Sequence, residues 1–416
     1  MNTSSTSDAG VVIAGGGQAG FQVAASLRQL GFAGPVTIIA AEDRLPYQRP
    51  PLSKTYIKTD AGFDSLLIRP ESFYAKNDII VRMGQAVASI DRQASMVMLD
   101  SGEALSYRHL VLATGAANRA LAVEGATLPG VHGLRTAADA EALRAAVGAA
   151  QRLVIVGGGF IGLEVAAAVR SLGKDVVLIE AADRLMGRTV SRPVSAFFLD
   201  QHRAMGTEIR LQTALAAVVG GARAEGVLLA DGTTVAADIV LIAAGVVPED
   251  RLARDAGLAT DNGIVVDAYM TTADPRIFAI GDCAVFESPF TDRPVRLESV
   301  QNAVDQAKTV AARIVGPGEP YRSVPWFWSD QGPYKLQVVG LTAGADHVEL
   351  AQLGEADRLI AYCFRADRLL GIETVNRPGE HMLGRRILGQ DLTIARAEVA
   401  RHDFDLKAHV ASLSGG

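Results

Sequence analysis

Two segments of the chain show the same succession of apolar and polar positions. In the first, the apolar run from Val11 to Ala14 is followed by a glycine-rich turn. A stretch from Phe21 to Leu30 with helical spacing comes next, and then a second apolar run from Val36 to Ala40. Two short apolar runs joined by a segment of helical period indicate a β-α-β unit. This order predicts parallel strands that are buried on both faces.

The second segment repeats this order. An apolar run from Leu153 to Val156 precedes another glycine-rich turn, a helical stretch that ends near Leu172, and a further apolar run from Val176 to Ile179. The chain therefore contains two copies of one dinucleotide-binding unit.

Both turns have the spacing G-x-G-x-x-G. The first glycine allows the tight turn, the second lets the backbone approach a pyrophosphate, and the third lets helix and strand pack closely. The start of the helix then offers N–H groups and the positive end of its dipole to the phosphates. Glycines also serve ordinary turns, but strand, turn, helix and strand in this order favour nucleotide binding. The turn residues are Gly15, Gly17, Gln18, Ala19 and Gly20, and Gly157, Gly159, Phe160, Ile161 and Gly162.

An acidic residue about 20 positions after such a turn binds the adenine ribose. In the first unit Glu42 has this position, with Asp43 as the alternative; in the second, Glu180 ends the second strand. Because a carboxylate accepts both ribose hydroxyls and repels a 2′-phosphate, Glu180 favours NADH over NADPH. Arg184 and Arg188 follow closely and are either phosphate contacts or part of a solvated face.

Further apolar runs define the rest of the organisation. Between and after the two units we expect strands at 110–113, 239–243 and 278–280 and a helix at 303–315. In the last part of the chain we expect strands at 336–339, 348–350, 359–364 and 369–375, followed by a helix from Glu380. The sequence predicts an α/β fold with two Rossmann-like dinucleotide-binding domains plus a C-terminal α+β domain. The first domain is discontinuous, residues 1–115 and 246–325; the second covers 116–245 and the third 326–416.

Composition limits the classes of partner. A chain of 416 residues with 49% hydrophobic residues is long enough for two or three domains. With a net charge of −6, nucleic acid and anionic membranes are not expected partners. The apolar runs are far shorter than a membrane span of about 20 residues. Residues 1–10 lack a basic region and an apolar core, so they predict a disordered leader rather than a signal peptide, and we expect a cytoplasmic protein.

The two cysteines, Cys283 and Cys363, form no C-x-x-C pair. Neither a disulfide framework nor a cysteine-ligated metal cluster is expected, and no metal site is predicted.

Six stretches together resemble the FAD-dependent NADH:ferredoxin reductases of the putidaredoxin reductase and biphenyl dioxygenase reductase type. They are PYQRPPLSK (46–54), LATGA (112–116), GGGFIGLE (157–164), FAIGDCA (278–284), ESVQNA (298–303) and PWFWSDQ (325–331). The resemblance covers the chain from Val11 to about Gly389. Two departures are Gly332-Pro333 after the last stretch, and Ala41, where a second acid often precedes the position of Glu42.

The resemblance implies FAD at the first glycine-rich turn and NADH at the second. It implies that Lys54 approaches the flavin and pairs with Glu164 near the nicotinamide, and we predict these two as the catalytic residues. The remaining FAD-binding residues that it implies are Glu42, Arg49, Val87, Thr114, Gly115, Arg135, Gly281, Asp282, Val300 and Trp328. Those for NAD are Glu164, Glu180, Arg188 and Gly245, together with the turn residues.

The resemblance also implies the reaction. Because no thiol lies near Ser53 and Lys54, the flavin is expected to pass its electrons out of the chain, to a [2Fe-2S] ferredoxin that feeds a cytochrome P450 or an aromatic-ring dioxygenase. Two alternatives stay open: a rubredoxin reductase, and an NADH-binding flavoprotein redox sensor with little turnover.

Overall fold

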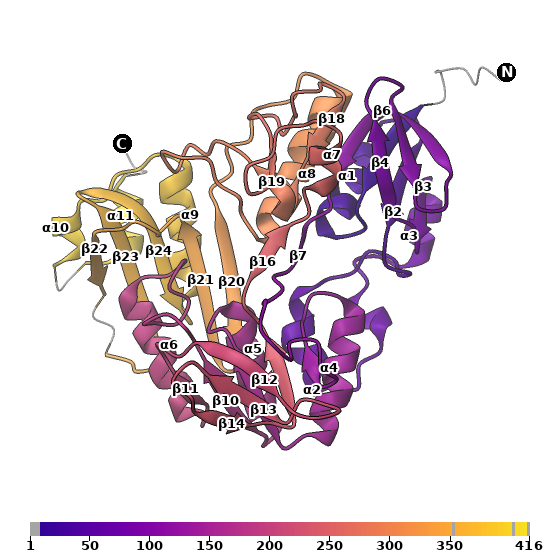
Figure 1. Ribbon diagram of the computed structural model, residues 1–416. Helices are drawn as coiled ribbons and strands as arrows, with labels where there is room; N and C mark the ends of the chain where they lie inside the picture. Colours follow the sequence, from indigo (N-terminus) through magenta and orange to yellow (C-terminus); the bar gives the residue numbers. More distant parts are fainter. Residues whose placement is uncertain (1–8, 352–353, 402–403, 414–416) are drawn as a thin grey trace. The chain divides into compact units, whose positions relative to one another are not determined.

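The computed structural model describes residues 9–351, 354–401 and 404–413, and the chain forms two compact units (Figure 1). Unit 1 contains the described residues up to Gln48, with Gly62–Ala117 and Val247–Ser323; unit 2 contains Arg49–Ala61, Asn118–Val246 and the described residues from Val324 on. The segment 49–61, which the sequence assigned to the FAD-binding domain, thus packs in unit 2. The three-domain division stays a prediction, and the expected leader lies outside the described residues except for its last two.

Unit 1 is built around a seven-stranded sheet. Its order is β3 (Ile79–Met83), β2 (Val36–Ala40), β1 (Gly10–Ala14), β6 (Ala104–Leu112), β5 (Met96–Leu99) and β4 (Val87–Asp91), and β18 (Ile277–Ala279) also pairs with β6. The strands β3, β2, β1, β6 and β18 run parallel, whereas β4, β5 and β6 are antiparallel neighbours. The parallel part contains the predicted β-α-β unit.

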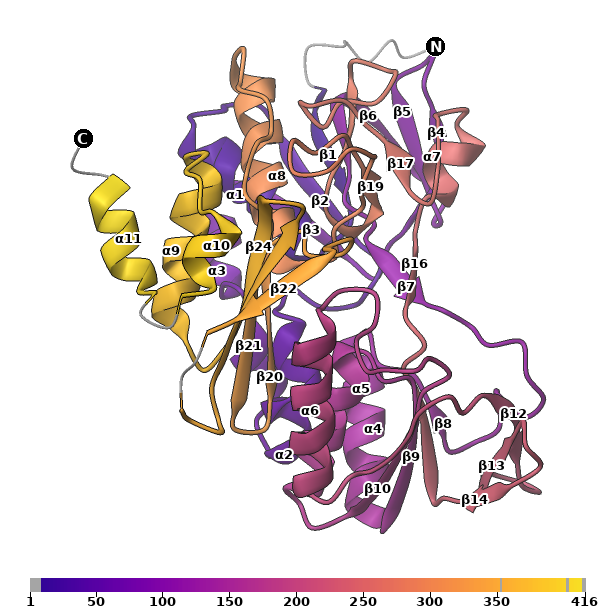
Figure 2. The ribbon, with the colours of Figure 1, turned by 90° about the vertical axis from the view of Figure 1, so that its left-hand side faces the viewer.

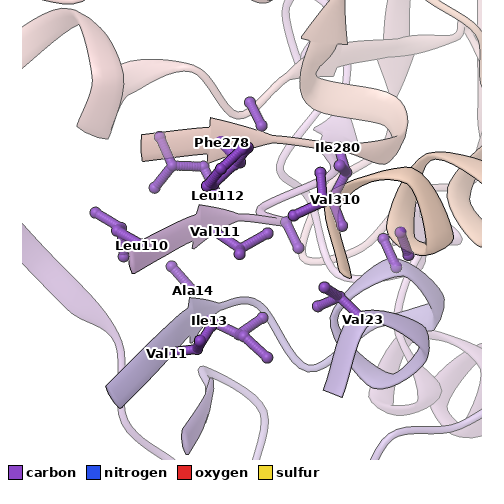
Figure 3. Packing of buried hydrophobic residues seen from close by; sticks show 14 of the residues in the cluster. Val11, Ile13, Ala14, Val23, Leu110, Val111, Leu112, Phe278, Ile280 and Val310 are labelled. Atoms are coloured by element: carbon purple, nitrogen blue, oxygen red, sulfur yellow. The ribbon is translucent and has the colours of Figure 1, made fainter. Parts of the chain in front are cut away.

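Two helices, α1 (Gln18–Gln29) and α8 (Val300–Val315), pack together in unit 1. Figure 3 shows Val23 of α1 and Val310 of α8 with apolar side chains of the strands β1, β6 and β18. All ten residues labelled there are buried, so this layer excludes water beneath the first glycine-rich turn. The remaining elements of unit 1 are η3 (Phe63–Leu66), α3 (Glu71–Lys76), α7 (Arg251–Asp255), β17 (Ile264–Val265), η4 (Gly281–Cys283) and β19 (Ala284–Val285).

The first half of unit 2 contains a five-stranded parallel sheet. Its order is β11 (Glu208–Arg210), β10 (Asp175–Ile179), β9 (Arg152–Val156), β15 (Ile239–Ile242) and β8 (Val131–His132). The helices α4 (Ala137–Ala149), α5 (Phe160–Arg170) and α6 (Arg192–Ala204) belong to this half, as does a small sheet of β12 (Leu215–Val219), β13 (Gly226–Leu229) and β14 (Thr234–Ala236). The segment 49–61 adds η2 (Pro50–Ser53) and α2 (Thr55–Lys58), which pack against α4 and α5.

The second half of unit 2 is an antiparallel sheet with helices. The strand order is β20 (Trp326–Gln331), β21 (Tyr334–Gly340), β24 (Arg368–Val375), β23 (Leu359–Arg365) and β22 (His347–Leu350), drawn in orange and yellow in Figures 1 and 2. The helix α9 (Pro378–Gly389) packs on β21 and β24. The shorter helices α10 (Arg396–Val399) and α11 (Leu406–Leu413) complete this part. Two further strands, β7 (Ala116–Asn118) and β16 (Val246–Pro248), pair where the chain passes between the units.

The departure at Gly332-Pro333 forms the two-residue loop between β20 and β21. Gly332 has a φ of +64°, and proline fixes the next φ near −65°. This pair of angles suits the type II′ turn of a tight hairpin. The unusual dipeptide therefore fixes the register in which Trp328 pairs with Gln337.

The fold class is confirmed: two Rossmann-like sheets and a C-terminal α+β part are present. The predicted strands and helices all occur, with ends displaced by a few residues. The hydrophobic pattern did not predict several elements, among them β3 to β5, β8, β11, β20, α4, α6 and the small sheet β12 to β14. Within the described part of the chain, no helix is both long and apolar enough to span a bilayer.

Candidate dinucleotide sites and a buried ion pair

The first glycine-rich turn follows β1 and is shaped by two close approaches. Gly15 has a φ of +128°, and a Cβ there would lie 2.1 Å from the carbonyl oxygen of Ala113. A Cβ on Gly20 would lie 1.9 Å from the oxygen of Gly15, whereas one on Gly17 would meet nothing within 4 Å. Gly17 precedes α1 with no side chain capping the helix. The turn therefore leaves open space at a helix N-terminus, which fits a pyrophosphate.

The other FAD-assigned residues of unit 1 gather near this turn. A Cβ on Gly281 would lie 3.3 Å from the Cβ of Ala19 and 3.8 Å from that of Ala303, so η4 approaches the starts of both α1 and α8. The amide of Gly281 donates to Gln306 Oε1 at 2.7 Å, which fixes the backbone beside Asp282. Val300 is the first residue of α8. The structure thus brings Ala19, Gly281 and the start of α8 together.

Glu42, Val87 and Thr114 have different surroundings. Tyr47, which is 3% exposed, donates its hydroxyl hydrogen bond to Glu42 Oε2 at 2.6 Å, so this carboxylate is oriented by a buried ring. Val87 belongs to the hydrophobic core. The hydroxyl of Thr114 donates to the carbonyl of Glu249 at 2.6 Å, and Gly115 follows with a φ of +72°.

The second glycine-rich turn repeats the geometry of the first. A Cβ on Gly157 would lie 2.4 Å from the carbonyl oxygen of Ala243, and one on Gly162 would lie 2.2 Å from that of Gly157. Gly159 again has nothing within 4 Å of an added Cβ, and no side chain caps α5 behind it. This site therefore also fits a pyrophosphate. Phe160 packs against Phe327, with the ring centroids 5.0 Å apart, while Ile161 is half-buried.

Glu180 is held by backbone amides. Its Oε2 accepts from Gly158 N at 2.6 Å and its Oε1 from Ala182 N at 2.8 Å. Arg184 donates to the carbonyls of Gly187 and Val190, so its guanidinium braces its own loop. Arg188 is exposed, and its Nη2 would lie 3.4 Å from a Cβ on Gly245. The structure therefore places Glu180 and Arg188 around the second turn and engages Arg184 elsewhere.

Lys54 and Glu164 lie in contact inside unit 2. Lys54 Nζ is 2.9 Å from Glu164 Oε2 and 3.1 Å from the carbonyl oxygen of Pro50. Glu164 lies in the second turn of α5 and is 5% exposed. Its Oε2 also accepts a hydrogen bond from Ser53, and its Oε1 accepts one from Ser329 at 2.7 Å. A buried charge is tolerated when it is paired and hydrogen-bonded, as this carboxylate is.

Three further FAD-assigned residues lie in unit 2. Arg49 Nη1 donates to the carbonyl of Arg135 at 2.6 Å, and the amide of Arg135 donates to Asp139. Trp328 lies on β20, and its ring centroid is 5.8 Å from that of Trp326. The FAD-assigned residues are thus divided between the two units, whereas the NAD-assigned residues all lie in unit 2.

The two cysteines are both fully buried and free. Burial raises the pKa of the Cys283 and Cys363 thiols, which keeps them protonated and weakly nucleophilic. Among the described residues, no three His, Cys, Asp or Glu side chains are grouped as metal ligands.

Four polar residues that are hydrogen-bonded to Glu164, directly or through one another, were not singled out from the sequence, namely Ser53, Ser329, Gln331 and His202. Ser53 stands beside Lys54 in PPLSK. Ser329 and Gln331 alternate along β20, so both point to one face of the strand. The stretch PWFWSDQ contains this alternation, but it gives no indication that the partner of Ser329 is Glu164 on the helix α5.

The comparisons with known proteins agree with this architecture. Residues 9–307 match the family described as pyridine nucleotide-disulphide oxidoreductase, and residues 326–410 match the reductase C-terminal family. Rhodocoxin reductase of Rhodococcus erythropolis is 48% identical over 96% of this chain and 94% of its own length.

Two solved structures are also similar over nearly their whole lengths. The ferredoxin reductase for the CYP199A2 system of Rhodopseudomonas palustris is 46% identical, with a TM-score of 0.94 over 96% of this chain and 99% of that one. Putidaredoxin reductase, in its covalent complex with putidaredoxin, is 38% identical, with a TM-score of 0.95 over 98% of this chain and 100% of that one. The chain therefore belongs to the pyridine nucleotide-disulphide oxidoreductase family and carries a C-terminal domain of the reductase C-terminal family.

Proposed function

We propose that this protein is an FAD-dependent reductase that transfers electrons from NADH to a [2Fe-2S] ferredoxin, which in turn feeds a cytochrome P450 or an aromatic-ring dioxygenase. The observation that carries the proposal is the ion pair between the half-buried Lys54 and the buried Glu164, which lies on the helix that opens at the second glycine-rich turn. The similar proteins support it, since they include a reductase for a P450 system and one captured with its ferredoxin.

When bound, the nicotinamide dinucleotide would supply a hydride, and FAD would supply the conversion of this two-electron input into single electrons that suit an iron–sulfur acceptor. The chain's own residues bind and orient these groups. The open turns at Gly17 and Gly159 take the two pyrophosphates at helix N-termini, and Asp282 binds the FAD ribityl chain. The ammonium of Lys54, fixed by Glu164, stabilises negative charge that develops on the flavin ring.

The coenzyme is NADH rather than NADPH in this proposal. Glu180 is already aligned by two amides to accept the ribose hydroxyls, and Arg184 is engaged by loop carbonyls instead of facing a phosphate. We further propose that the protein works in the cytoplasm, where NADH is available as reductant.

The test follows electrons in two stages. First, the holoenzyme is mixed anaerobically with NADH, and flavin bleaching is followed by stopped flow. Second, purified [2Fe-2S] ferredoxins and rubredoxins are added and their reduction is measured. We expect rapid bleaching followed by ferredoxin reduction. Preferential reduction of rubredoxin would identify a rubredoxin reductase, and a long-lived reduced complex that no carrier oxidises would identify a redox sensor.

Lys54→Met tests the role of the ammonium, and Lys58→Met, an exposed position in α2, is the matched control. Loss of the positive charge should slow flavin reduction and lower the flavin midpoint potential, because the reduced ring loses a stabilising cation. The control should keep both values. Wild-type reduction kinetics and potential in Lys54→Met would remove this residue from the mechanism.

A further inference from the structure

A chain of polar side chains crosses the interior of unit 2 and ends at Glu164. His202 on α6 contacts Gln331 Oε1 through its Nε2 at 2.9 Å. Gln331 Nε2 donates to Ser329 Oγ at 3.2 Å, and Ser329 Oγ donates to Glu164 Oε1 at 2.7 Å. The second oxygen of the same carboxylate contacts Lys54. The chain therefore joins the helix α6, the strand β20 and the helix α5 to the ion pair.

The direction of these hydrogen bonds is determined by the groups themselves. An amide oxygen only accepts, so His202 must carry its hydrogen on Nε2. Its Nδ1 is then the unprotonated nitrogen, and it has no hydrogen-bond partner in the described part of the chain. Burial lowers the pKa of His202, which keeps the ring neutral. Each of the three hydrogen bonds that join His202, Gln331, Ser329 and Glu164 therefore points toward the carboxylate, while Gln331 Nε2 also donates to Met186 Sδ at 3.5 Å.

The cost of burial argues against a purely structural role. Ser329, Gln331 and His202 are all 0% exposed. A polar network of this kind is at best weakly stabilising relative to an apolar core of the same shape. The same helix and hairpin are already joined nearby by a hydrogen bond from Tyr334 to Gln201 Oε1 at 2.6 Å. The polar chain therefore has its main effect at its end, on the orientation of Glu164.

We propose that Ser329, Gln331 and His202 are positioning residues for flavin reduction, which fix the Glu164 carboxylate and through it the ammonium of Lys54. The proposal rests on the proposed function, in which Lys54 stabilises the reduced flavin. The chain transfers neither protons nor electrons. Ser329 supplies the direct contact, Gln331 orients the hydroxyl of Ser329, and His202 prevents the amide of Gln331 from rotating.

The first experiment compares Ser329→Ala and Ser329→Thr with Tyr334→Phe, which removes the neighbouring hydrogen bond between α6 and the hairpin but does not touch Glu164. The limiting rate of flavin reduction at saturating NADH, the Kd for NADH, the FAD content and the thermal midpoint are measured for each. We expect Ser329→Ala to lower the limiting rate roughly tenfold with little change in Kd. Ser329→Thr, which keeps a hydroxyl, should restore most of the rate.

Tyr334→Phe should reduce its flavin at the wild-type rate. If Tyr334→Phe and Ser329→Ala slow flavin reduction equally, the loss comes from altered packing and not from the contact with Glu164, and the proposal is overturned. A wild-type enzyme that NADH does not reduce would overturn the proposed function instead, so the two failures are distinguishable.

A double-mutant cycle with Glu164→Gln tests whether Ser329 acts through Glu164. If it does, Ser329→Ala should have almost no further effect on the limiting rate in the Glu164→Gln background. Independent effects that simply multiply would contradict the proposal. This result separates a positioning role from a general loss of stability.

A spectroscopic measurement tests the chain without turnover. In the ¹⁵N-labelled oxidised holoenzyme, the ring signals of His202, identified by their loss in His202→Gln, should show a neutral ring protonated on Nε2. Glu164→Gln should shift the Nε2 signal, because the hydrogen bonds polarise one another along the chain. Tyr334→Phe should leave it in place. A ring protonated on Nδ1, or one that does not respond to Glu164→Gln, would refute the proposed chain.

Discussion

The second glycine-rich turn contains two glycines that the same substitution should affect in opposite ways. A methyl group added at Gly159 meets nothing within 4 Å, whereas one added at Gly162 lies 2.2 Å from the oxygen of Gly157 and 3.2 Å from Ile155 Cγ2. We therefore predict that Gly162→Ala destabilises the fold, and that Gly159→Ala leaves the fold intact but blocks the pyrophosphate.

The magnitudes follow from the contacts. To relieve the clash at Gly162, the start of α5 must move about 1 Å away from the turn, and overpacking of this kind costs about 1–3 kcal/mol. Alanine recovers up to about 1 kcal/mol through helix propensity and a less flexible unfolded chain. The net loss for Gly162→Ala is therefore about 1–2 kcal/mol. At Gly159 the φ of −83° suits alanine, and the weaker helix cap offsets the gain in the unfolded state, so the net change is within about 0.5 kcal/mol.

The assay measures urea unfolding midpoints and the Kd for NAD⁺ in both variants. Gly162→Ala should unfold at lower urea. Gly159→Ala should unfold with the wild type and bind NAD⁺ at least roughly tenfold more weakly, because the methyl group occupies the space of a phosphate. Wild-type NAD⁺ affinity in Gly159→Ala would show that the pyrophosphate does not lie over this turn. Equal destabilisation of the two variants would show that a methyl group at Gly159 also clashes with other atoms of the fold.

Three other predictions concern carboxylates. Asp282→Ala should lose FAD during purification, because the ribityl contact disappears; a variant with full flavin content would remove that assignment. Glu180→Ala should narrow the ratio of kcat/KM for NADH over NADPH, and an unchanged ratio would place the selectivity elsewhere. Burial raises the pKa of Glu373 above its ordinary 4.5, so the folded chain keeps a proton that the unfolded chain releases. The free energy of unfolding should therefore fall as the pH rises above about 4.5, toward the folded pKa. Urea titrations at several pH values should show that the free energy of unfolding falls less with pH in Glu373→Gln than in the wild type. The same pH dependence of this free energy in both proteins would contradict the linkage.

The two glycine-rich turns and their flanking elements were predictable because their structure depends on residues that are close together in the sequence. A strand, a G-x-G-x-x-G turn and a helix follow one another within about 20 residues, and their angles and packing depend mainly on the turn itself. The positive φ at Gly15 and Gly157 and the close approaches at Gly20 and Gly162 have the steric origin that the spacing implies. Glu180 was found for the same reason, since it ends the strand that follows the turn.

The surroundings of Glu164 were not predictable in this way, although the resemblance implied its pairing with Lys54. Ser53 is 111 residues from Glu164 and Ser329 is 165 residues from it, while His202 is 129 residues from Gln331. No rule of periodicity or capping acts over such separations. They are set by how the segment 49–61 and the strand β20 pack against α5.

The buried acid Glu373 shows the same limit. Glu373 lies on β24 between Ile372 and Thr374 and is fully buried, and nothing in the residues next to it predicts which groups accompany its carboxyl group. Its oxygens accept from Ser191, 182 residues away, and from Thr342, 31 residues away. Sequence alone thus determined the two nucleotide-binding units and their glycines, because these depend on neighbouring residues. The tertiary structure decided which distant polar groups surround each buried carboxyl group, because only packing of the whole unit brings those groups within hydrogen-bonding distance.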